Sequence, residues 1–265
     1  VTIDSVEHYF DRPYNGLKNV GINSKVYLLG KSSVALSNPV WTITEKPNGS
    51  NATFGTTKDI DTSNQLITFV PDVQGTYKIT FTSGTKTSEI TFNGALYYGV
   101  EGGPASCKTC HNNILFDYVY DKWAGTNHAI STQKGVDGIL SSHFNQSCLK
   151  CHATGYDTQA ANDGFDDFPF VFPTTLVPGN YTTLVGLYPD AMKRANVQCE
   201  ACHGPGSNHL SQIDNSKIDV TLSSDVCAYC HKEGSHHNIP LQWDESVHAA
   251  GTHLYSGSSR YACTP

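Results

Sequence analysis

Four short stretches of the sequence place two cysteines three residues apart and follow them directly with a histidine. This C-x-x-C-H pattern is the attachment sequence of a c-type haem. The two cysteines form thioethers with the vinyl groups of the porphyrin, and the histidine is the proximal ligand of the iron. The sequence therefore predicts four haem sites, which use Cys107 and Cys110, Cys148 and Cys151, Cys199 and Cys202, and Cys227 and Cys230, with His111, His152, His203 and His231 as proximal ligands.

Zinc is the alternative chemistry for four C-x-x-C pairs, because two sites of four cysteines each would use all of them. A zinc site gives no reason for a histidine directly after every pair. A thioredoxin-like dithiol gives no reason for it either. We therefore predict haem c as the cofactor.

The remaining histidines are the candidates for the second, distal ligand of each iron. The sequence holds 12 histidines and a single methionine, Met192. Histidine–methionine ligation, which raises the potential of a haem, can therefore not be the general scheme. Ligation of four haems by two histidines each needs four of the eight that remain, which are His8, His128, His143, His209, His236, His237, His248 and His253.

An internal repeat marks two of these histidines. In each copy a tryptophan follows the motif histidine by twelve residues and precedes another histidine by five. A tryptophan at this spacing can pack beside a haem while the histidine ring reaches an iron. The repeat therefore predicts His128, after Trp123, and His248, after Trp243, as distal ligands.

The same repeat predicts a further haem site at the end of the sequence. After the first unit the next C-x-x-C-H begins at Cys148, and after the second unit comes Cys263. We expect Cys263 to open a fifth motif whose remainder lies beyond Pro265. The alternative is a lone free cysteine.

His209 follows His203 by six residues across a Gly-Pro-Gly turn. Six residues hardly reach the other face of the same haem, so we expect His209 to bind the iron of a neighbouring haem. The other candidates are His143, one of the adjacent pair His236 and His237, and His253, which serves either the fifth haem or none; His8 is expected at the surface.

The composition limits the possible partners and the compartment. The chain of 265 residues carries a net charge of −7, to which haem propionates would add. This argues against nucleic-acid binding and favours a basic docking partner. No apolar run is long enough to span a membrane. Because haem attachment to C-x-x-C-H is completed outside the cytoplasm, we expect a periplasmic or extracellular protein, with Val1 beginning a mature or clipped chain.

Residues 1–97 hold no cysteine and read as an antiparallel β-sandwich, because short alternating runs are separated by turn residues. The segment from Pro71 to Thr80 resembles the tyrosine-corner segment of immunoglobulin-like and polycystic-kidney-disease-type domains. Trp41 would then be a core tryptophan, and the domain a docking module, a spacer or a passive fold. Strands are expected at Lys25–Leu29, Val40–Thr44, Gln65–Val70, Thr76–Thr82 and Thr87–Phe92.

Residues 98–265 are the predicted haem domain, which begins after a boundary rich in glycine at Tyr97–Ala105. So many motifs leave little chain for an ordinary core, and we expect loops and short helices that pack on the porphyrins. Pro169, Pro173 and Pro178 predict an irregular loop, and the acidic segment before it is more readily a solvated loop than a calcium site. Helices are expected at Asn112–Trp123, Asp190–Ala195 and Gln242–Ala249.

The segments CEACHGPGSNH (Cys199–His209) and CLKCHATGY (Cys148–Tyr156), with the two W-x-x-x-x-H-A units, resemble the multihaem cytochrome c superfamily. Its members include the tetrahaem cytochrome of ammonia-oxidising bacteria and hydroxylamine oxidoreductase. The resemblance covers about residues 105–265 and implies low-spin haems with two histidine ligands, stacked in close pairs. It also implies that His209, His128 and His248 are distal ligands.

These observations lead us to expect an electron-transfer protein that relays electrons between redox partners, which include other cytochromes. One alternative is a catalytic member that acts on a small nitrogen or sulfur compound, although no motif marks Tyr97, Tyr98, Tyr118 or Tyr120 as a haem-crosslinked tyrosine. The other alternative is self-assembly into a conductive polymer of haem domains.

Overall fold

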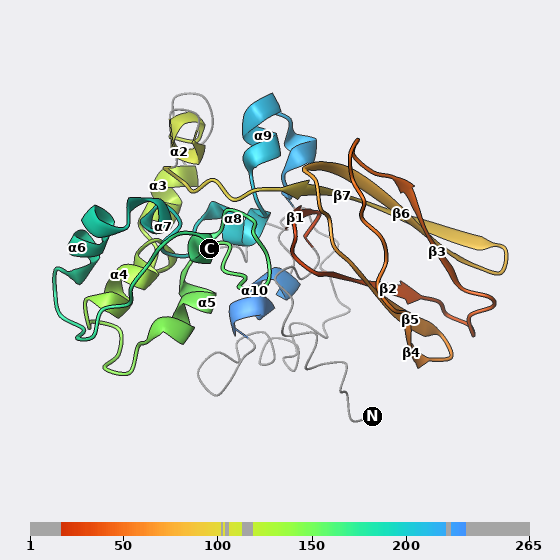
Figure 1. The fold of residues 1–265 in the computed structure, drawn as a ribbon, viewed down its shortest axis with the longest axis horizontal. Coiled ribbons are helices and arrows are strands. Elements are labelled where there is room, and N and C mark those ends of the chain that lie inside the picture. The colour runs from red at the N-terminus through yellow and green to blue at the C-terminus, as the bar shows by residue number, and fades with distance from the viewer. Residues whose placement is uncertain (1–16, 102, 104–105, 113–118, 221–223, 232–265) are drawn as a thin grey trace, which may run out of the picture.

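The computed structural model describes residues 17–231, apart from 102, 104–105, 113–118 and 221–223. Strands occupy the first part of this range and short helices the second, with α8, α9 and α10 lying between the strands and the other helices (Figure 1). The predictions for His8, His236, His237, His248, His253 and Cys263, and for a helix at 242–249, lie outside the described residues.

The strands form two sheets. One has the order β1-β7-β6-β3 and the other the order β2-β5-β4. Strand β1 runs parallel to β7, while the other pairs are antiparallel. The strands are β1 (Asn19–Gly21), β2 (Val26–Lys31), β3 (Val40–Glu45), β4 (Lys58–Asp61), β5 (Asn64–Phe69), β6 (Gly75–Ser83) and β7 (Lys86–Ala95).

Alternation of apolar and polar residues explains the strands. In β6, the side chains of Tyr77, Ile79 and Phe81 are buried and those between them are more exposed, as expected for a strand with one face on a core. All five predicted strands are present, as β2, β3, β5, β6 and β7. Strands β1 and β4 were not predicted from the sequence, because they have three and four residues and so show little alternation.

Tyr77 has the hydrogen bonding of a tyrosine corner. Its side chain is fully buried, and its hydroxyl accepts a bond from the Val73 N–H at 2.9 Å and lies 2.8 Å from the Val73 carbonyl oxygen. The expectation that Trp41 is a core tryptophan is only partly met. Strand β3 lies at the edge of its sheet, so Trp41 is half-buried, packs on Phe81 and donates its indole N–H to Gln65.

The second part consists of short helices joined by loops. The expected helix at 190–195 corresponds to α7, which begins one residue earlier and ends three residues earlier. Helix α6 was not predicted, and no helix or strand interrupts the loop around the three prolines. The helices are α2 (Cys107–Cys110), α3 (Val119–Ala124), α4 (Ser131–Val136), α5 (Leu149–His152), α6 (Asn180–Leu187), α7 (Pro189–Met192), α8 (Cys199–His203), α9 (Ser207–Gln212) and α10 (Ser224–His231), with 3-10 turns η1 (His128–Ile130), η2 (Gln146–Cys148), η3 (Phe165–Asp167) and η4 (Asn215–Lys217).

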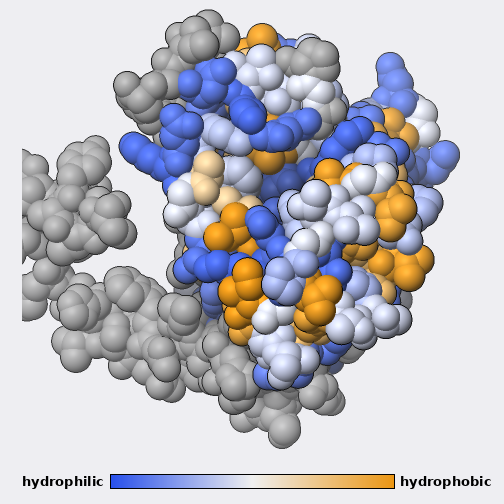
Figure 2. Space-filling model, turned by 90° about the vertical axis from the view of Figure 1, so that its left-hand side faces the viewer, coloured by the Kyte–Doolittle hydropathy of each residue, from blue (hydrophilic) through white to orange (hydrophobic). Residues whose placement is uncertain are grey.

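The expectation that this part has no ordinary core is wrong for residues 136–195. Val136, Leu149, Phe165, Leu184 and Met192 are buried in one apolar cluster, which aromatic side chains of the proline-rich loop also join. The loop therefore gains order from packing rather than from regular structure. On the outer face of the helical part, hydrophobic and hydrophilic residues are interspersed (Figure 2).

Candidate haem-binding region

Each C-x-x-C-H motif lies on a helix. The first coincides with α2, the second with η2 and α5, the third with α8 and the fourth with the end of α10. Residues three apart on a helix share one face, so the two sulfurs of a motif point to the same side. The eight cysteines of these motifs form no disulfide with one another and are half-buried or exposed. This is the arrangement needed to attach one planar group at two points.

The four motifs are close neighbours. A hydrogen bond between the Cys107 and Cys199 thiols, together with burial, raises the pKa of Cys107; the same hydrogen bond lowers the pKa of Cys199, where burial acts in the opposite direction. Burial and the nearby Cys227 raise the pKa of Cys202 to about 11. The Cys230 sulfur lies 3.8 Å from the carbonyl oxygen of Cys151. These contacts join the first motif to the third, the third to the fourth, and the fourth to the second.

A cavity lies where the second, third and fourth motifs meet. Its apolar walls include Ala153, Val197 and Val226. Such walls suit a large, flat and mostly apolar cofactor. The motif cysteines and histidines that line it are Cys151, His152, Cys202, Cys227, Cys230 and His231, and His128 lines it as well.

His128 faces His231, with the two ring centres 6.0 Å apart. A metal–nitrogen bond to histidine is about 2 Å long, and the ring centre lies about 1 Å further, so two rings on opposite sides of one metal have centres about 6 Å apart. The planes of the two rings differ by 50°. Both planes would contain the same metal–nitrogen axis, so this rotation is compatible with binding. The separation of the two rings is therefore compatible with a haem iron held between them, and the assignment of His128 as a distal ligand stays a prediction.

The repeated tryptophan positions His128 through the backbone. The Trp123 indole N–H donates to the Val197 carbonyl at 2.9 Å. The Val197 N–H in turn donates to the His128 carbonyl at 3.1 Å. The spacing of tryptophan and histidine thus ties His128 to the residue two before Cys199.

His203 and His209 have the tautomer expected of iron ligands. The His203 Nδ1 lies 2.6 Å from the carbonyl oxygen of Asp219, and the His209 Nδ1 lies 2.9 Å from that of Asp214. A carbonyl only accepts, so both Nδ1 atoms carry the proton and Nε2 presents a lone pair. Burial, followed by the proximity of His209 and His203, lowers the pKa of His111. His209 thus lies near the proximal histidine of the first motif.

The second motif histidine has a different environment. The His152 ring packs edge-on against Phe144, with centres 5.2 Å apart. His143 is exposed and makes hydrogen bonds with Ser141 and Asn145, both within two residues. Its assignment as a distal ligand stays a prediction.

The acidic loop at residues 157–167 is held by hydrogen bonds within the loop. The Asp166 carboxylate accepts a bond from the Asp157 N–H, and that of Asp167 accepts bonds from the Asn162 and Gly164 N–H groups. Burial raises the pKa of Asp166 to about 6. Within the described part of the chain, no three histidine, cysteine or acidic side chains are grouped so that they could hold a bare metal ion.

Glu200 is a buried residue of the third motif that the sequence analysis did not single out. Its side chain is 1% exposed, and its carboxylate accepts backbone N–H bonds from Tyr98, Gly99 and Gly206 at 2.7–3.1 Å. Burial raises the pKa of Glu200, and these N–H groups act in the opposite direction. The carboxylate joins the segment that follows the β-region, which is the part of the chain from β1 to β7 (residues 19–95), to the turn before His209. The only sequence signal is an acidic residue between two haem cysteines.

These features are compatible with the attachment of c-type haem. Residues 106–170, which include the first two motifs, match the family model for cytochrome c554 and c-prime. The match supports a c-type cytochrome, a class that binds haem c and transfers electrons. No curated protein and no solved structure matches the chain. None of the described helices is long and apolar enough to cross a membrane.

Proposed function

We propose that this chain is an exported multihaem c-type cytochrome that relays electrons through closely packed haems with two histidine ligands each. The haems supply the one-electron chemistry of iron. The observation that carries the proposal is the separation of 6.0 Å between His128 and His231, since it fits two ligands of one iron. Iron held by two histidines changes valence without changing its ligands.

The chain's own residues would hold each haem next to another. The contacts between motifs give a path from the first to the third, fourth and second sites. His128 would complete the fourth site and His209 the first, because His209 lies near His111. Residues 1–97 would form an immunoglobulin-like domain, which the tyrosine corner and the parallel pairing of β1 with β7 support, and residues 98–265 the haem domain.

Spectra of the purified holoprotein test the proposal. We expect an intact mass that shows at least four haems, and electron paramagnetic resonance (EPR) spectra with low-spin ferric haem only. A five-coordinate, high-spin haem in the unmodified protein would instead favour the catalytic alternative.

A variant of His128 tests the ligand assignment. His128→Ala should convert one low-spin haem into a high-spin one, because it removes the distal ligand of the fourth iron. Asn127→Ala changes the exposed neighbour on the same turn and should leave every haem low-spin. If His128→Ala keeps the unmodified spectrum, the pairing of His128 with His231 is wrong.

A further inference from the structure

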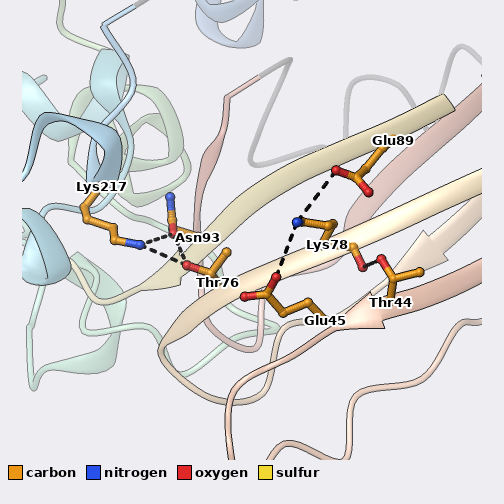
Figure 3. Close-up of polar contacts among 7 residues, drawn as sticks. All are labelled: Thr44, Glu45, Thr76, Lys78, Glu89, Asn93 and Lys217. Carbon is orange, nitrogen blue, oxygen red and sulfur yellow. Dashed lines mark hydrogen bonds and ion pairs between the residues drawn. The ribbon is translucent and has the colours of Figure 1, made fainter.

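The β-region contacts the segment that follows the third haem motif. The Lys217 ammonium group donates to the Thr76 hydroxyl at 2.9 Å and lies 3.4 Å from Asn93 Oδ1 (Figure 3). Asn93 donates to the Ser216 carbonyl at 3.1 Å, and Asn19 donates to the Lys217 carbonyl. Strands β1, β6 and β7 therefore all bind residues 216–217.

Asp219 continues this contact. Its side chain is 3% exposed, and its carboxylate accepts the Lys18 backbone N–H at 2.7 Å. Lys18 directly precedes β1. The position of Asp219 is thus set by the edge of the sheet.

The backbone of Asp219 in turn holds the proximal histidine of the third motif. Its carbonyl accepts the His203 Nδ1–H at 2.6 Å, and its N–H donates to the His203 carbonyl at 3.1 Å. Gly204, next to His203, allows this approach: it has φ of +76°, and a side chain there would collide with the Asn19 carbonyl. The chain from Lys18 through Asp219 to His203 is therefore continuous.

We propose that the β-region is part of the third haem site, where it positions His203 through Asp219 and thereby sets the reduction potential of that haem. This inference rests on the proposed function, because it requires a haem on the third motif. A proximal histidine whose Nδ1–H donates to a well-placed carbonyl is a stronger electron donor to its metal. A more strongly donating histidine stabilises ferric iron. Loosening the hydrogen bond between His203 and the Asp219 carbonyl should therefore raise the reduction potential of the haem.

The test compares variants of the full holoprotein by redox titration of individual haems, followed optically and by EPR. Asp219→Ala removes the anchor to Lys18. We expect one haem couple to shift upward by about tenfold in its equilibrium constant, which is about 59 mV for one electron. The other couples should not move.

A milder pair of variants keeps the test decisive if Asp219→Ala does not fold. Lys217→Met removes the contact with Thr76 and Asn93 and should shift the same couple in the same direction by about two- to threefold. Lys78→Met is the matched control, because Lys78 lies two residues from Thr76 on β6 and its ammonium group pairs with Glu45 and Glu89 (Figure 3). It should shift no couple.

The inference is overturned if every folded variant keeps all wild-type potentials, or if several couples move together. Failure of the proposed function would look different. The unmodified protein would then lack a haem on Cys199 and Cys202, or would contain high-spin haem, before any variant was made.

Discussion

The second and third haem motifs are held in contrasting ways. Around the second, Leu149 is fully buried in an apolar cluster, and Phe144 packs against the His152 ring. Around the third, backbone groups hold two side chains by hydrogen bonds: the Gly99 N–H donates to the buried Glu200 carboxylate, and the Asp219 carbonyl accepts from His203. Apolar packing is non-directional, whereas a hydrogen bond depends on the direction in which its donor and acceptor point. The second site should therefore respond to substitution mainly in stability, and the third also in redox properties.

Leu149→Ala should have the largest effect on stability, because it empties space in the cluster beneath the second motif. We expect a loss of about 2–5 kcal/mol in the free energy of unfolding, measured by urea denaturation. Leu187→Ala, at a side chain that is 63% exposed, should cost less than about 0.5 kcal/mol. Equal losses in the two variants would contradict the packing role.

Glu200→Gln should come next. One oxygen of the carboxylate becomes an amide NH₂ that faces backbone N–H donors, so we expect a loss of about 1–3 kcal/mol. The same denaturation measurement applies, with the exposed Glu89→Gln as control. If Glu200→Gln had the same free energy of unfolding as the unmodified protein, the hydrogen bonds of Glu200 would not hold the third motif in place.

Asp166→Asn should have the smallest effect and depend on pH. Burial raises the folded-state pKa of Asp166 from 3.8 to about 6, so the folded state favours the protonated form. The contribution of Asp166 to the free energy of unfolding is complete below its pKa in the unfolded chain and is lost as the pH rises through 6. The variant should therefore match the unmodified protein at pH 4 and exceed it by about 1 kcal/mol at pH 8, after discounting for partial exposure.

Thermal or urea unfolding at the two pH values measures this difference. Asp121→Asn, at an exposed position on α3, controls for the loss of one negative charge. A gain for Asp166→Asn that is the same at both pH values would show that burial of the charge is not its cause.

The features that could be predicted from the sequence are those with local signals. The C-x-x-C-H motifs mark the candidate residues for haem attachment, and alternation in segments such as Thr76–Thr82 predicts the strands. The contacts of Asp219 with Lys18 and of Glu200 with Gly99 could not be predicted, because these partners lie 201 and 101 residues away in the chain. The apolar cluster was missed because its residues are spread over many short segments rather than arranged in one periodic helix.

The proposed pairing of His128 with His231 would have a consequence for the unfolded chain. An iron bound by both rings would close a loop of about 100 residues, much as a disulfide does. A crosslink over such a loop lowers the entropy of the unfolded state by an amount worth about 4–5 kcal/mol. Each distal ligand drawn from a remote segment would add such a loop. The haems would thus act as reversible crosslinks, and the stability of the fold would depend on whether the iron–histidine bonds survive denaturation.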